Sequence, residues 1–125
     1  MKAIVVAVLA LLLFLPVQTL ELAEVQPIRQ ETIDPWVGYE ELKTICTCES
    51  GLIHEVNGKV VRGQINSEDI GICQINRFYH GKRATSLGLD LMIKEDNIAF
   101  AKLLFNEQGS RPWNWSRSCW EKSVN

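Results

Sequence analysis

The sequence has no run of basic residues and no alternation of basic with aromatic residues. Its formal net charge is −2 at pH 7. Nucleic-acid-binding proteins usually carry a basic patch for the phosphates, so binding to nucleic acid is not indicated. The slight acidity also gives no strong attraction to an anionic surface. The chain contains no internal repeat and no low-complexity segment, and its 125 residues suggest one domain.

The sequence also lacks an apolar run long enough to cross a membrane comfortably. The run from Ala3 to Leu15 ends at Pro16 and is shorter than the about 20 residues that a membrane helix needs. Residues 1–19 are therefore predicted to be a signal peptide, although no clear A-x-A cleavage site follows. An uncleaved N-terminal anchor is the alternative, and it is the only membrane contact expected. Residues 20–34 have no sustained period and are predicted to be a linker, which leaves residues 35–125 as the folded domain.

Cysteine is scarce, and the four present are Cys46, Cys48, Cys73 and Cys119. An even number in a small exported domain, whose core is marginal without cross-links, predicts two disulfides. Cys46 and Cys48 lie two residues apart on a predicted helix and point to different sides, so a bond between them is not expected. Which of them pairs with Cys73 stays open at this point. A zinc site is the alternative, but C-x-C is shorter than the usual zinc spacing, and no metal or organic cofactor is expected.

Two helices have recognisable ends. Asp34 as N-cap and Pro35 as first helical residue begin the first, and Gly51 ends it. Its face is formed by residues that recur at threes and fours, namely Trp36, Tyr39, Leu42, Cys46 and Glu49. The second helix begins with the acidic pair before Asn97, which favours the helix dipole, and it ends at Gly109.

The remaining elements are short. Asn57-Gly58 between β-branched residues predicts a hairpin. The apolar segment 70–75 fits either a strand or a buried helical turn. Residues 77–90 contain two glycines and are predicted to form a loop with at most one helical turn, and residues 116–122 are predicted to form a last short helix.

Two segments of this chain resemble a known family. Glu49-Ser50-Gly51, followed by residues 69–76 with the sequence D-I-G-I-C-Q-I-N, resembles the E-S…G-x-x-Q-I-N signature of lysozyme-like muramidases. The likeness is to the small lytic transglycosylase (SLT-type) domain in its version with an Asp before this block, and chicken-type lysozymes are more distant. Weaker similarities extend the resemblance to residues 37–120. One departure is that Asn114-Trp115-Ser116 stands where many such domains carry A-Y-N-A-G, which leaves the choice between lyase and hydrolase open.

The resemblance implies an α+β fold, mainly helical and lysozyme-like, with a small β-hairpin as one wall of a glycan groove. It implies an exported protein of the cell envelope or the extracellular space that cleaves peptidoglycan between N-acetylmuramic acid and N-acetylglucosamine. The expected partner is the glycan strand, and the expected activity is that of a lytic transglycosylase. A lysozyme-type hydrolase and a non-catalytic module that binds glycan or regulates a partner are the alternatives. The oligomeric state is not indicated.

The resemblance also assigns roles to single residues. Glu49 is expected to be the general acid and then the base, which requires burial to raise the pKa of its carboxyl group. Asp69 is expected to assist rather than to act as an essential second catalyst. Substrate contacts are predicted for a further set, in which a structural role is the alternative for each: Ser50, Gln74, Tyr79, Asn97 and Trp113. His54 and His80 show no partner pattern and are interpreted as surface residues.

The predicted helix faces then favour one disulfide pairing. Cys46 shares the face of Glu49, which must look toward the block that contains Cys73. Cys48 points to another side of the helix, where the C-terminal tail has room to pack. We therefore predict the bonds Cys46–Cys73 and Cys48–Cys119.

Overall fold

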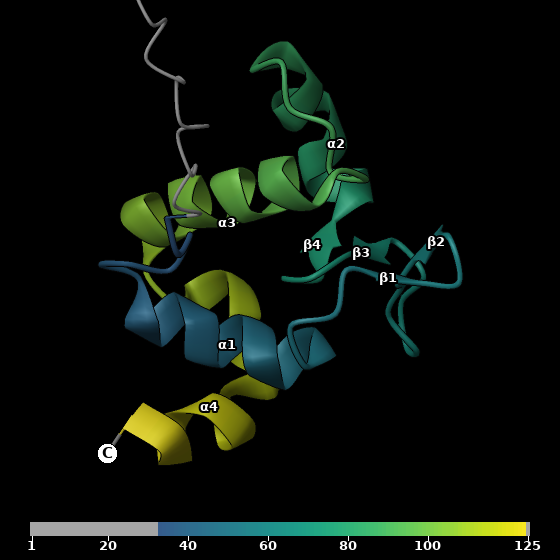
Figure 1. The fold of residues 1–125 in the computed structure, drawn as a ribbon. Coiled ribbons are helices and arrows are strands. Elements are labelled where there is room, and N and C mark those ends of the chain that lie inside the picture. Colours follow the sequence, from purple (N-terminus) through teal and green to yellow (C-terminus); the bar gives the residue numbers. More distant parts are fainter. Residues whose placement is uncertain (1–32, 125) are drawn as a thin grey trace, which may run out of the picture. The chain divides into compact units, whose positions relative to one another are not determined.

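The computed structural model describes residues 33–124, which belong to one unit of the chain, Thr32–Asn125. The predicted signal peptide, and the predicted linker as far as residue 32, lie outside the described residues. The elements are α1 (Glu40–Ser50), β1 (Glu55–Val56), β2 (Lys59–Val60), β3 (Asp69–Ile70), β4 (Ile75–Asn76), α2 (Arg77–Ser86), α3 (Lys94–Gln108), the 3₁₀ helix η1 (Arg111–Ser116) and α4 (Arg117–Val124) (Figure 1). The described part is therefore α+β and mainly helical, as predicted.

Helix α1 begins later than predicted. Asp34 does cap a backbone N–H, because its Oδ1 accepts a hydrogen bond from Trp36 N at 3.0 Å. This bond closes a turn that contains Pro35, and the helix starts only at Glu40. The predicted end is confirmed, since Gly51 has a φ of 68° and terminates α1 in the left-handed conformation.

Two short antiparallel hairpins follow α1. Strands β1 and β2 pair through Asn57-Gly58, whose φ values of 51° and 74° are both positive, as a tight two-residue hairpin turn requires. Strands β3 and β4 pair antiparallel through a turn at residues 71–74. The segment 70–75 is thus neither one strand nor a helical turn, because its two ends are the strands of a second hairpin. A bridge between Arg62 and Ile70 links the two hairpins.

Helix α2 corrects the prediction of a loop at residues 77–90. It has 10 residues, and Asn76 caps it by accepting a hydrogen bond from Tyr79 N at 3.1 Å. Gly81 lies inside this helix, and because glycine disfavours helix formation, its presence led to the prediction of a loop. The helix also has little apolar periodicity, since only Ala84 among its residues is buried.

Helix α3 follows the prediction and ends at Gly109. Helix α1 lies between α3 and α4 and contacts both (Figure 1). The core joins buried side chains of α1, the β3–β4 hairpin and α3, with the largest being Leu42, Ile45, Ile70, Ile72, Ile75, Phe100 and Leu104. The predicted last helix is α4, which follows directly on η1.

The disulfides are Cys46–Cys73 and Cys48–Cys119, which is the pairing predicted from the helix faces. All four thiols are used in these bonds, so the alternative zinc site is excluded. Among residues 33–124, no group of three or more metal-binding side chains gathers. Two disulfides are typical of proteins in oxidising compartments outside the cytosol. In the same residues, no helix has the length and apolar character needed to span a membrane.

Candidate functional site

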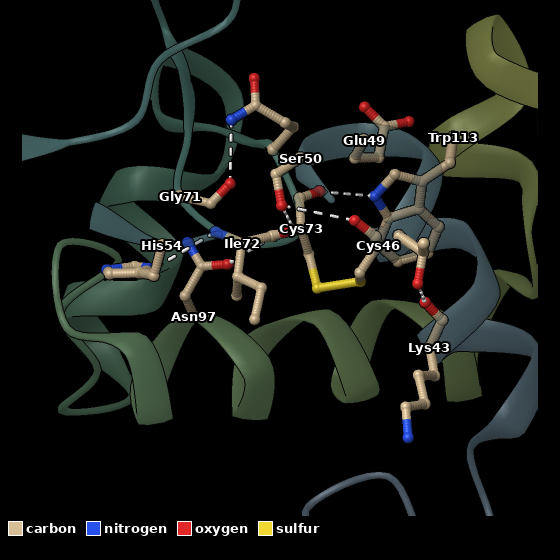
Figure 2. Close-up of a disulfide and its surroundings, with 12 residues drawn as sticks. Lys43, Cys46, Glu49, Ser50, His54, Gly71, Ile72, Cys73, Asn97 and Trp113 are labelled. Carbon is tan, nitrogen blue, oxygen red and sulfur yellow. Dashed lines mark hydrogen bonds between the residues drawn. A yellow bond between two sulfur atoms is a disulfide. The ribbon is translucent and has the colours of Figure 1, made fainter. Parts of the chain in front are cut away.

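Glu49 lies in the last turn of α1 and is half-buried. Its Oε1 accepts a hydrogen bond from the Ser116 hydroxyl at 2.5 Å. Burial raises the pKa of Glu49, the hydrogen bond from Ser116 lowers it, and the negative charge of Asp69 raises it. Because burial is the largest of the three, the pKa lies above its ordinary value of 4.5, which is the direction that a general acid needs. In Figure 2 the carboxyl group points away from the Cys46–Cys73 disulfide.

Asp69 is the first residue of β3 and is half-buried. Its Oδ1 accepts a hydrogen bond from the Asn76 side-chain amide at 2.8 Å, across the β3–β4 pair. The carboxylate is therefore held by the hairpin and is not simply a solvated turn residue. Its negative charge raises the pKa of Glu49, so the two predicted catalytic carboxyl groups lie within electrostatic range of each other.

Ser50 and Gln74 brace the site through backbone contacts. The Ser50 hydroxyl donates to Ile72 O at 2.6 Å and so ties the end of α1 to the β3–β4 turn (Figure 2). The Gln74 side-chain amide donates to Gly71 O at 2.9 Å within that turn. Both side chains are half-buried, and their contact with a sugar stays a prediction.

The prediction that Asn97 and Trp113 contact substrate is wrong, because both side chains are buried in the core. Asn97 is 0% exposed, and its amide donates to Ile70 O and to Leu91 O, each at 2.9 Å. Its Oδ1 accepts from Cys73 N at 3.2 Å. Trp113 is 3% exposed, and its indole N–H donates to Cys73 O at 2.9 Å (Figure 2). These contacts fix the β3–β4 turn, and neither side chain has a surface on which a sugar can stack.

Three aromatic side chains among the described residues are exposed and available for stacking, namely Phe78, Tyr79 and Trp115. Tyr79, on the first turn of α2, is 75% exposed and packs edge-on against Phe78. Trp115 is 100% exposed and directly precedes Ser116, the residue that contacts Glu49. Trp113 and Trp115 are two residues apart, and the sequence alone did not show which of them faces the core.

His54 is a structural residue that the sequence did not reveal, and its interpretation as a surface residue is wrong because it is only 7% exposed. Its Nδ1 accepts a hydrogen bond from Ile72 N at 3.2 Å. Its Nε2 lies 2.9 Å from Met92 O, which can only accept, so Nε2 is the ring nitrogen that donates. His54 thus connects the β3–β4 turn to the segment before α3. His80, also interpreted as a surface residue, is half-buried.

Gly71, in the same turn, has a φ of 73°, and a Cβ there would lie 2.5 Å from His54 Cε1. We expect Gly71→Ala to lower the free energy of unfolding by at least about 2 kcal/mol, because backbone strain adds to a side-chain clash. Gly88→Ala is the matched control, since Gly88 has the same φ but no atom within 4 Å of the added Cβ. Denaturant unfolding measures both variants. Equal losses for the two would show that contact with His54 contributes nothing.

Two hollows lie elsewhere on the described surface. One has a volume of about 550 Å³ between α2 and the segment 88–92, and the other has about 680 Å³ between residues 52–55 and 92–95. Glu49 lines neither of them.

Comparison of the chain with protein-family models, with curated proteins and with solved structures found no match.

Proposed function

We propose that this protein is an exported muramidase that cleaves the β-1,4 bond between N-acetylmuramic acid and N-acetylglucosamine in peptidoglycan. The observation that carries the proposal is Glu49, a half-buried carboxyl group at a helix end whose pKa burial and the charge of Asp69 raise. Both residues belong to the sequence block that resembles lysozyme-like muramidases. The two disulfides support export, because such bonds persist in oxidising compartments.

The leading activity is that of a lytic transglycosylase. Glu49 donates its proton to the glycosidic oxygen as the bond to C1 of the muramic residue breaks. The resulting carboxylate then takes the proton from the 6-hydroxyl of the same residue, whose oxygen attacks C1 and forms a 1,6-anhydro ring. No enzyme nucleophile is needed. The negative charge of Asp69 stabilises the oxocarbenium-like transition state.

In this proposal the hairpins form one wall of the glycan groove, as in the lysozyme-like fold. Trp115 and Tyr79 supply exposed aromatic faces, which suit the apolar face of a sugar ring. Trp115 takes the role expected of Trp113, because only Trp115 is accessible.

Mass spectrometry of fragments released from purified peptidoglycan tests the proposal. A lytic transglycosylase releases anhydro ends, whereas a hydrolase releases reducing ends that are heavier by one water. Failure to release either product would refute the muramidase proposal and favour a non-catalytic glycan-binding or partner-regulating module.

The hydrolase is the second candidate, and the position of Asp69 is the observation that favours it. Chicken-type lysozymes carry their second carboxylate at the matching place, and Asn76 holds the Asp69 carboxylate firmly. A hydrolase that retains configuration needs its two carboxyl groups about 5–5.5 Å apart.

We expect Asp69→Asn to lower cleavage by about 10- to 100-fold, or ~1.4–2.7 kcal/mol of barrier, while anhydro ends are still released. Losing the Asp69 charge also lowers the pKa of Glu49, so the alkaline limb of the pH–rate profile moves to lower pH. Glu68→Gln is the control, since it removes the neighbouring charge from the Arg77 ion pair. If Asp69→Asn were as inactive as Glu49→Gln, and the wild type released reducing ends, the hydrolase would replace the transglycosylase.

A further inference from the structure

The hydroxyl group of Ser116 has two acceptors within reach. Its Oγ lies 2.5 Å from Glu49 Oε1 and 3.1 Å from the carbonyl oxygen of Trp113. A hydroxyl group has only one proton to donate, and the shorter contact to a carboxyl oxygen is the stronger one. The Trp113 carbonyl meanwhile accepts the Trp120 indole N–H at 3.1 Å. The Ser116 proton is therefore directed to Glu49.

The second oxygen of Glu49 has a different environment. No described residue donates a hydrogen bond to Oε2, and among the described residues no buried side-chain nitrogen or oxygen lacks a partner. Oε2 is therefore open to solvent. One oxygen of the carboxyl group is held by the protein, and the other is open.

A covalent bond keeps Ser116 in place. Ser116 ends η1, and three residues later Cys119 is bonded to Cys48, which directly precedes Glu49 in α1. Trp120 is buried in the same segment. The contact between Glu49 and Ser116 joins residues 67 apart in the sequence, and the disulfide beside it restrains both partners.

We propose that Ser116 is a positioning residue that holds Oε1 of Glu49 as a hydrogen-bond acceptor and so directs the transferable proton to Oε2. The inference rests on the proposed function, in which Glu49 delivers a proton to the glycosidic oxygen. With Oε1 occupied as an acceptor, the acid form of Glu49 has its O–H at Oε2, where the leaving oxygen can take it. After transfer, Ser116 stabilises the carboxylate that must accept the next proton.

Among the described residues, Asp69 in β3 is the one charged group among the causes of the Glu49 pKa shift, so the effect of Ser116 on this pKa can be separated from charge effects. Arg111 in η1 and Arg117 in α4 both bond to near neighbours along the chain. Donation from Ser116 favours the ionised form of Glu49, so removing the hydroxyl group raises the pKa of Glu49 further.

The test compares Ser116→Ala with the isosteric pair Ser116→Thr and Ser116→Val, of which only Thr keeps a hydroxyl group. We expect Ala and Val to lower kcat by about 10- to 100-fold, because the proton is no longer held in the productive geometry. In both variants the titration midpoint of the Glu49 carboxyl, followed by ¹³C NMR and in the pH–rate profile, should move to higher pH. Thr should restore the midpoint and most of the rate. Ser123→Ala is the control, since it removes an exposed hydroxyl group from α4.

The NMR titration needs no enzymatic activity, so the two proposals fail separately. An unmoved midpoint in Ala and Val would overturn the role of Ser116, whatever the rate. The midpoint could move in the Ser116→Ala and Ser116→Val variants while the wild type releases no peptidoglycan fragments. That result would support the coupling of Ser116 to Glu49 and refute the muramidase. If Ala does not fold, the difference between Thr and Val decides, because their side chains have the same shape.

Discussion

Glu49→Gln is expected to lower peptidoglycan cleavage by at least ~10²-fold while leaving the fold intact. The reason is that the amide has no acidic proton to transfer to the leaving oxygen, whereas burial raises the pKa of the Glu49 carboxyl group. The measurement is the release of soluble fragments from purified peptidoglycan. Glu55→Gln serves as the control because Glu55 is exposed on β1. Turnover near the wild-type level in Glu49→Gln would end the assignment.

The same substitution should stabilise the protein at neutral pH. The folded state raises the pKa of Glu49 above its ordinary value of 4.5, so it binds this proton more tightly than the unfolded chain does. That contribution to stability is fully present below pH 4.5 and is lost as the pH rises through the folded-state pKa. Gln never ionises, so Glu49→Gln should melt at a higher temperature than the wild type at pH 7 and at nearly the same temperature at pH 4. Thermal unfolding at the two pH values measures this, and a lower melting temperature at pH 7 would contradict it.

Removal of the Cys48–Cys119 disulfide is expected to have the largest effect on stability. The bond spans 71 residues, and the chain-entropy relation gives a loss of about 4 kcal/mol for a loop of that length. Domains have a total stability of only about 5–15 kcal/mol, so the variant Cys48→Ser/Cys119→Ser should be close to unfolding at 37 °C. Denaturant unfolding measures the loss, with the single variant Ser123→Ala as a control in α4. A loss below about 1 kcal/mol would show that packing alone holds α4 on α1.

This variant also tests the site. The disulfide restrains Ser116 beside Glu49, so cleavage should fall even at temperatures where the folded state still dominates. Activity that stays at the wild-type level in the folded double variant would show that the other contacts of α4 and η1 position Ser116 without the bond.

The sequence by itself determined the features that depend on local backbone chemistry. Gly51 and Gly109 end their helices because glycine adopts positive φ without a steric penalty. Asn57-Gly58 forms its hairpin for the same reason. The 3.6-residue period places Cys46 and Cys48 on different sides of one helix, which ruled out a bond between them. The pairing itself followed from the expected orientation of Glu49 toward the block that contains Cys73.

Only the tertiary structure decided which polar and aromatic side chains are buried. Trp113 and Trp115 are the same residue type two positions apart, yet the packing of η1 buries Trp113 in the core and leaves Trp115 in solvent. His54 became a buried connector because the backbone of residues distant in sequence supplies its hydrogen-bond partners. The contact of Ser116 with Glu49 likewise depends on how α4 and η1 pack on α1, which no local pattern encodes. The carboxyl group that was predicted from the sequence thus acquires its raised pKa only in the folded protein, where distant segments exclude water from it.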